Sequence, residues 1–226
     1  MEWLNLVVRW IHVITGVAWI GTSFYFNWLE GTLNRKGEKP KGVAGDLWAI
    51  HGGGFYHVTK YAVAPANLPE TLHWFKWEAY FTWISGFALL CIVYYHGANL
   101  YLIDPAVANL PVWGAVLIGL LVLGLGWYVY DTLCRSMKTN PIGLAIVGFL
   151  LVIGTAFLLC SLFTPRGAYI HIGALLGTLM AGNVFRVIIP NQKEMVDDMV
   201  EGKEPDPEPG KDALQRSIHN NYLTLP

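Results

Sequence analysis

The stretch RWIHVITGVAWIG, residues 9–21, decides how this chain folds. It lies within an apolar run from Trp3 to Leu29, which is long enough to cross about 30 Å of hydrocarbon as a helix. Inside the run stand Arg9 and His12, which a helix serving only as an anchor does not need. The stretch therefore predicts a membrane helix whose polar face points into a helix bundle.

The composition of the whole chain also indicates a membrane protein. Of the 226 residues, 54% are hydrophobic and only 14% are charged, whereas about a quarter are charged in soluble domains. Lipid offers the backbone no hydrogen-bond partner, so each long apolar segment is expected to be helical. We expect an all-α polytopic membrane helix bundle with five transmembrane helices and the start of a sixth, the five being 3–29, 77–95, 111–133, 142–163 and 168–189.

The segments outside these helices divide the chain further. Residues 1–193 form the expected bundle, which includes a Gly-rich cytoplasmic loop at 30–76. Residues 194–216 are acidic and Pro-rich, which is typical of a mobile, solvated linker. Residues 217–226 end in HNNYLTLP and are expected to begin a further, truncated membrane segment. We therefore expect the chain to be a fragment of a longer protein that is inactive alone.

The distribution of positive charge predicts the orientation. The connection between the first two helices contains Arg35, Lys36 and Lys60, whereas His96–Leu110 contains no Lys or Arg. Positive charge stays on the cytoplasmic side. The N-terminus is therefore expected outside, which in a bacterial inner membrane is the periplasm.

Two histidines lie at membrane depth toward that outer side. His12 stands about 13 Å into the first helix at 1.5 Å per residue, and His171 near the outer end of the fifth. Neutral imidazole ligates haem iron, so His12 and His171 are candidate ligands of a b-type haem. Arg9 and Arg166 would then bind its propionates. The alternative is that each His hydrogen-bonds a neighbouring helix and each Arg extends to the headgroups.

A second polar group is expected on the inner side. The segment GDLWAIHGGGFYHVTKYAVAP, residues 45–65, has β-forming residues on both sides of Gly52–Gly54, which is consistent with a hairpin. It would place His51, His57 and Lys60 near the cytoplasmic membrane surface. Asn183 and Arg186, at the inner end of the fifth helix, can face the same region. A solvated interfacial loop is the alternative.

The remaining polar and aromatic residues have simpler interpretations. The three cysteines have no metal-ligand or haem-attachment spacing and are expected to pack as small apolar residues. Asp131 and Arg135 are four apart, as in a helical ion pair. An aromatic belt at the membrane interfaces accounts for the following tryptophans: Trp10, Trp28, Trp77, Trp113 and Trp127.

Several blocks of the sequence resemble one known family over essentially the whole chain. They are RWIHVITGVAWIGTSFYFNWLE, HGGGFYHVTKY, LPETLHWFKWEAYFTWISGF, GALLGTLMAGNVFRVIIPNQK and HNNYLTLP. Together they are similar to the N-terminal membrane domain of the PuuD-type urate hydroxylases. That family implies eight membrane helices followed by a cytochrome c domain. This chain has no Cys-x-x-Cys-His, so a covalent c-type haem is expected only in a C-terminal domain beyond it.

The resemblance implies an oxidoreductase of purine catabolism. It would convert urate to 5-hydroxyisourate and pass electrons to a cytochrome c, as a domain of the same protein or a separate one. From their chemistry and position, His51 and His57 are candidate catalytic residues, and Lys60, Asn183 and Arg186 candidate urate ligands. The lipid bilayer is the other expected partner, and nucleic acid is not. Two other classes stay open: a purine or anion permease, and a b-type haem subunit that only carries electrons.

Overall fold

A computed structural model describes residues 2–224 and confirms the all-α membrane fold. Within these residues, five helices are long and apolar enough to cross a membrane. They are α1 (Glu2–Thr32), α2 with its continuation η1 (Trp77–Leu89 and Leu90–Tyr95), α4 (Val112–Ser136), α5 (Pro141–Cys160), and α6 with η2 and α7 (Pro165–Asn183, Val184–Ile188 and Ile189–Val200). The expected helices agree with these to within several residues, except that the last one extends to Val200.

The chain divides into two compact units, which are described separately. The first comprises Met1–Gly16 and Ala79–Gly182, and the second comprises Val17–Glu78 and Asn183–Pro226. Both α1 and the last long helix therefore contribute residues to each unit.

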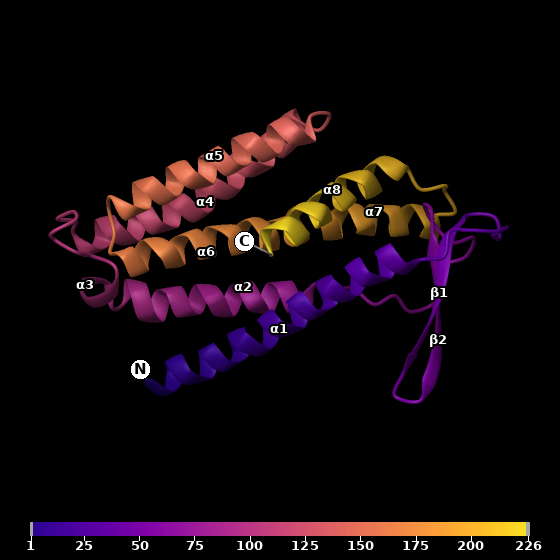
Figure 1. Cartoon of the computed structure of the whole chain (residues 1–226), viewed down its shortest axis with the longest axis horizontal. Helices are drawn as coiled ribbons and strands as arrows, with labels where there is room; N and C mark the ends of the chain where they lie inside the picture. The colour runs from indigo at the N-terminus through magenta and orange to yellow at the C-terminus, as the bar shows by residue number, and fades with distance from the viewer. Residues whose placement is uncertain (1, 225–226) are drawn as a thin grey trace. The chain divides into compact units, whose positions relative to one another are not determined.

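The core of the first unit forms where a short helix, α3 (Ala98–Tyr101), meets α4 and the turn between α5 and α6. Leu102, Leu159 and Phe163 are fully buried there. The Thr164 hydroxyl donates to the Tyr101 carbonyl, and the Thr164 amide donates to the Leu102 carbonyl. These bonds fix the start of α6. In Figure 1, α4 and α5 lie side by side as an antiparallel pair.

The second unit contains the hairpin that the Gly-rich segment predicts. Strand β1 (Val43–His51) pairs antiparallel with β2 (Gly54–Tyr61), and Trp48 lies opposite His57. Gly52 and Gly53 form the turn with φ of +57° and +81°. Two successive positive φ values suit a tight hairpin turn and favour glycine. Within residues 2–224 this pair is the only sheet, and the hairpin interpretation is confirmed.

One face of the hairpin packs on the end of α1. Leu47 is buried against Leu29 and Leu33, and Ala49 and Val58 pack around them. The backbone of Asn34, just after the helix, forms an antiparallel β-bridge with the backbone of Asp46. The hairpin consequently stands at the C-terminal end of α1, with its strands running across the helix direction (Figure 1).

The charged segment 194–216, expected to be a mobile linker, is mostly helical. It contains the end of α7 and the first part of α8 (Pro207–Leu223), with a turn at 201–206 between them. Asp206 caps α8 by accepting a hydrogen bond from the Glu208 amide, and Pro207 fits the first helical position. The two helices pack on each other and on η2. The expected boundary at 217 lies inside α8, and Leu225 and Pro226 are outside the described residues.

Candidate functional sites

The open face of the hairpin carries an ordered polar cluster. Nε2 of His57 lies 3.0 Å from Oδ2 of Asp46, and Lys39 donates to Oδ1 of the same carboxylate. The His57 ring also stacks on Trp48, with 4.4 Å between ring centroids and 18° between planes. A carboxylate and an aromatic ring thus orient one imidazole, and its Nδ1 is the nitrogen left to act as a base.

Asp46 supplies the negative charge of this cluster. Its hydrogen bonds to Lys39, and then to His57, lower the pKa of the Asp46 carboxyl below its ordinary value. The carboxylate is therefore ionised at neutral pH. The ionised carboxylate lies within hydrogen-bond distance of the imidazole and fixes the orientation of its ring.

The pairing of the strands separates the two candidate catalytic histidines. His51 lies opposite Gly54, three positions along β1 from Trp48, which lies opposite His57. Side chains alternate between faces of a strand, so His51 and His57 point to opposite faces. A single substrate on the open face can therefore use His57 but not both.

Lys60 belongs to the covered face of the hairpin. Its ammonium lies 2.5 Å from a carboxylate oxygen of Glu30 in α1, and Arg35 contacts the other oxygen at 2.6 Å. The charge of Lys60 is thus balanced by Glu30. This arrangement favours a structural link between β2 and α1 over an anion-binding role.

A buried cluster of amides and a guanidinium surrounds Asn183. Nδ2 of Asn183 donates to Oδ1 of Asn220 at 2.9 Å. Nη1 of Arg216 donates to Oδ1 of Asn183 at 3.2 Å. Asn183 is fully buried, and Arg216 is 3% exposed. Buried polar groups of this kind are stable only when they are hydrogen-bonded. The cluster joins α8 to the helix that carries Asn183.

Arg186, the other candidate ligand on that helix, is exposed. The sequence interpretation missed Arg216 and Asn220 because it assigned their segment to a linker and a membrane entry. Their spacing of four residues places them on one face of a helix. That spacing is the feature of the sequence that could have indicated their shared role.

His12, in the first unit, faces α2. Its Nδ1 lies 3.0 Å from the Thr82 carbonyl oxygen and 3.2 Å from the Ser85 hydroxyl. A Cβ built on Gly86 would come within 2.9 Å of the ring, so glycine is what allows this close approach. The predicted polar face of α1 is thus a helix-packing contact. Arg9 is exposed, and its guanidinium donates to Asn5 within the same helix.

His171 is fully buried at a different part of the same unit. Its Nδ1 lies 2.8 Å from the Gly167 carbonyl oxygen, and its Nε2 lies 3.3 Å from the Tyr95 hydroxyl. Nearby, Nε of Arg166 donates to the Tyr94 hydroxyl at 3.0 Å, and the guanidinium lies 4.9 Å from the centroid of the Tyr101 ring.

The arrangement does not fit one haem held by both histidines. His12 contacts α2 at Ser85, whereas His171 contacts η1 at Tyr95, ten residues further along the same helix. That spacing corresponds to roughly 15 Å along a helix axis. Two ligands of one iron must reach the same point, so side chains separated by this distance along the helix do not fit one haem. Arg166 is likewise engaged with tyrosines.

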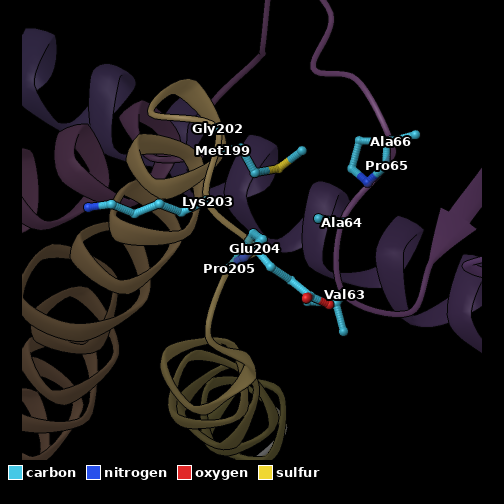
Figure 2. Close-up of a pocket in the computed structure, with 9 residues that line it drawn as sticks. All are labelled: Val63, Ala64, Pro65, Ala66, Met199, Gly202, Lys203, Glu204 and Pro205. Atoms are coloured by element: carbon cyan, nitrogen blue, oxygen red, sulfur yellow. The ribbon is translucent and has the colours of Figure 1, made fainter.

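A surface cavity of about 330 Å³ lies in the second unit (Figure 2). It is lined by residues 63–66 and by the turn after α7. In Figure 2 the Lys203 side chain runs away from Pro65, while the Glu204 carboxylate lies beside Val63. The Lys203 ammonium pairs with Glu201 at 2.6 Å. A cavity that turns its cation outward and presents a carboxylate is a poor site for an anion such as urate.

These features define a helical membrane protein with an ordered histidine on a β-hairpin and two buried polar clusters. Comparison with known families then identifies its relatives: the model of the family described as "Urate oxidase N-terminal" matches residues 1–226, and the chain belongs to that family. No curated protein and no solved structure matches the chain. The family membership confirms the resemblance and supports a function related to urate oxidation.

Proposed function

We propose that this protein is a membrane-bound urate hydroxylase that converts urate to 5-hydroxyisourate and passes the electrons to a cytochrome c. The observation that carries the proposal is the match to the urate oxidase N-terminal family over residues 1–226. The five long apolar helices support a membrane-bound enzyme. The positive charge between the first two spans favours a cytoplasmic hairpin and a periplasmic N-terminus.

The reaction requires a base and an electron acceptor. Urate and one water give 5-hydroxyisourate, two protons and two electrons. The base removes a proton from the water as its oxygen bonds to the oxidised purine ring. A ferric cytochrome c takes the electrons one at a time, either as a domain of the same protein or as a separate one.

We assign the base to His57 on the open hairpin face. Its Nε2 is held by Asp46, so Nδ1 is directed away from the carboxylate and is available for a proton. Asp46 holds the imidazole in the orientation that keeps Nδ1 accessible. Trp48 stacks on the His57 imidazole and holds it in place. The Trp48 side chain is 68% exposed, so a planar purine can lie beside it.

The test is urate-dependent reduction of cytochrome c by the intact protein in proteoliposomes. We expect His57→Gln to lower turnover on the order of 100-fold, as is typical for loss of a positioned base. Asp46→Asn should lower kcat more than it raises KM. The matched control is His51→Gln, which removes an exposed imidazole from the other face of the same hairpin.

Each outcome bears on a different part of the proposal. Normal turnover in His57→Gln would overturn the assignment of the base. A loss in His51→Gln alone would move the site to the other hairpin face. Uptake of urate into the vesicles without any reduction of cytochrome c would overturn the enzyme proposal in favour of a permease.

A further inference from the structure

The tip of the β-hairpin, residues 50–56, is apolar and carries no charge. Residues 47–59 contain no Asp, Glu, Lys or Arg. The large side chains of the tip are strongly exposed: Ile50 by 67%, Phe55 by 76% and Tyr56 by 54%. The hairpin lies outside the long apolar helices, and a group of large apolar side chains exposed in such a segment marks an interaction site.

The exposed side chains of the tip lie on both faces of the sheet. Ile50 pairs with Phe55, whereas Tyr56 pairs with Ala49. Directly opposed residues share a face and successive residues alternate, so Ile50 and Phe55 lie on one face and Tyr56 on the other. A protein that docks on a flat sheet covers one face only. An apolar fluid surrounds both faces, so this arrangement favours lipid as the partner.

The hairpin lies at the level where α1 ends. Leu47 packs against Leu29 and Leu33 at the end of that helix. Just before them, Tyr25 and Trp28 are exposed, and exposed Tyr and Trp residues on membrane helices concentrate at the membrane surface. The strands run across the helix direction (Figure 1). The hairpin therefore extends sideways from α1, at the level that these aromatic residues mark.

The strands are long enough to carry the tip past the side of α1. The distance from Leu47 to Gly52 is roughly 16 Å at about 3.3 Å per residue, whereas a helix with its side chains has a radius of about 5 Å. The turn, Gly52–Gly54, has no side chains to cover its backbone. Hydrocarbon offers backbone groups no partner, so the tip fits the headgroup layer, where water and lipid oxygens are present.

The base of the hairpin carries cations that suit an anionic membrane surface. Lys36 and Lys41, in the connection between α1 and β1, are exposed. Within residues 2–224 no carboxylate pairs with either of them. A lysine close to an anionic leaflet is attracted to its headgroups. An apolar part beside exposed lysines is the combination by which amphipathic segments bind membrane surfaces.

We propose that the hairpin tip inserts into the headgroup layer of the leaflet at the C-terminal end of α1, with Lys36 and Lys41 bound to anionic lipid headgroups. This inference goes beyond the proposed function and does not depend on it. It attaches the hairpin at two points, the end of α1 and the membrane around Phe55. Trp48 and His57 pair with each other between these points, so the lipid contact holds the open face at the membrane surface.

The experiment is site-directed spin labelling of the intact protein, without urate, in nanodiscs of phosphatidylethanolamine and phosphatidylglycerol. Cys91, Cys134 and Cys160 are first replaced by alanine. A label is then attached to Phe55→Cys, or to Glu38→Cys as the control, because Glu38 is exposed and lies outside the tip. Electron paramagnetic resonance compares collisions of the label with oxygen, which concentrates in lipid, and with a water-soluble nickel complex.

We expect the label at Phe55 to collide more with oxygen than with the nickel complex, and the label at Glu38 to show the reverse. Tyr56→Cys, on the other face, should behave like Phe55→Cys. A Phe55 label that is open to the nickel complex would overturn the proposal. Shielding of that label from both reagents, or lipid contact on one face only, would also overturn it, because a protein partner would then cover the tip.

The role of the lysines is tested by Lys36→Gln combined with Lys41→Gln. In nanodiscs that contain phosphatidylglycerol, this variant should shift the label at Phe55 toward water. Replacing the lipid by phosphatidylcholine should shift it similarly in the parent protein. The matched control combines Lys203→Gln with Lys211→Gln, because these lysines pair with glutamates, and it should cause no shift. An unchanged label in the first variant would overturn the binding of lipid headgroups by Lys36 and Lys41.

A second measurement leaves the native cysteines in place. The photoreactive residue p-benzoylphenylalanine replaces Phe55, the protein is irradiated in the same nanodiscs, and the products are analysed by mass spectrometry. We expect adducts that are heavier than the protein by the mass of one lipid. A product of twice the protein mass would identify a second copy of this chain as the occupant of the tip and would overturn the proposal.

Discussion

The carboxamide of Asn183 donates a 2.9 Å hydrogen bond to the carboxamide of Asn220, thirty-seven residues further along the chain. Both side chains are buried, and Arg216 completes the cluster from the same helix as Asn220. This bond is a direct link between α8 and the end of α6. It makes the position of α8 sensitive to a single side chain.

We expect Asn183→Ala to loosen α8. Removing the amide leaves buried polar groups of Asn220 and Arg216 with a lost partner, which costs about 1–3 kcal/mol. The measurement is the thermal stability of the detergent-solubilised protein, together with the rate of proteolysis in the turn at 201–206. Arg186→Ala, an exposed change three residues away, is the control and should be close to neutral. Equal stability of the two variants would contradict a structural role for the cluster.

A second prediction concerns close packing between α4 and α6. A Cβ on Gly182 would overlap the Trp127 indole. Overpacking of this kind costs about 1–3 kcal/mol, so Gly182→Ala should lower the unfolding temperature. Gly177→Ala, on the same helix, meets open space and should not. The two melting curves, recorded in one detergent, check the prediction, and identical midpoints would count against it.

A third prediction concerns pH. Burial, followed by the nearby charge of Arg216, lowers the pKa of His219 below its ordinary value. The unfolded chain then binds a proton at a higher pH than the folded chain, so stability falls as the pH drops through the unfolded pKa of about 6.5 toward the folded one. Above that window the effect vanishes. His219→Gln should reduce the loss of stability between neutral and mildly acidic pH, whereas His96→Gln, an exposed change, should not.

A fourth prediction concerns His12. Because its imidazole packs on Gly86 and bonds to α2, we expect His12→Ala to weaken the contact of α1 with α2 and to leave any b-type haem band unchanged. A reduced-minus-oxidised difference spectrum of the intact protein and the variant checks this. Loss of such a band in a folded His12→Ala protein would restore the sequence-based haem hypothesis.

Much of the fold could be predicted because lipid restricts the choices. A long apolar run such as 142–163 has no stable alternative to a helix, and the glycines at 52–54 favour a tight turn. Helix α8 was missed because its sequence is polar and Pro-rich. It is stabilised by packing on α7 and η2, and such tertiary contacts are not visible in local composition.

The candidate sites show the same contrast at the level of single residues. The polar character of Asn183 and His171 could be predicted, since an ionisable or amide group in an apolar helix needs a partner. Their partners could not, because Asn220 and Tyr95 come from elements distant in sequence. Trp127, expected in the aromatic belt, instead packs on Gly182. Among the described residues its indole nitrogen is the buried side-chain donor without an acceptor.

The segment η1 is wound more widely than an α-helix. The His96 amide bonds to the carbonyl of Cys91, five residues earlier, so this turn holds one residue more than an α-helical turn. The extra residue is taken up within this turn, so later side chains keep the orientation that a continuous α-helix would give them. Deleting Ile92 would therefore return the turn to α-helical winding and leave Tyr95 facing His171, whereas a deletion in a regular helix such as α4 would rotate every later side chain by about 100° around the axis. A single missing codon is thus tolerated within η1 but not within α4.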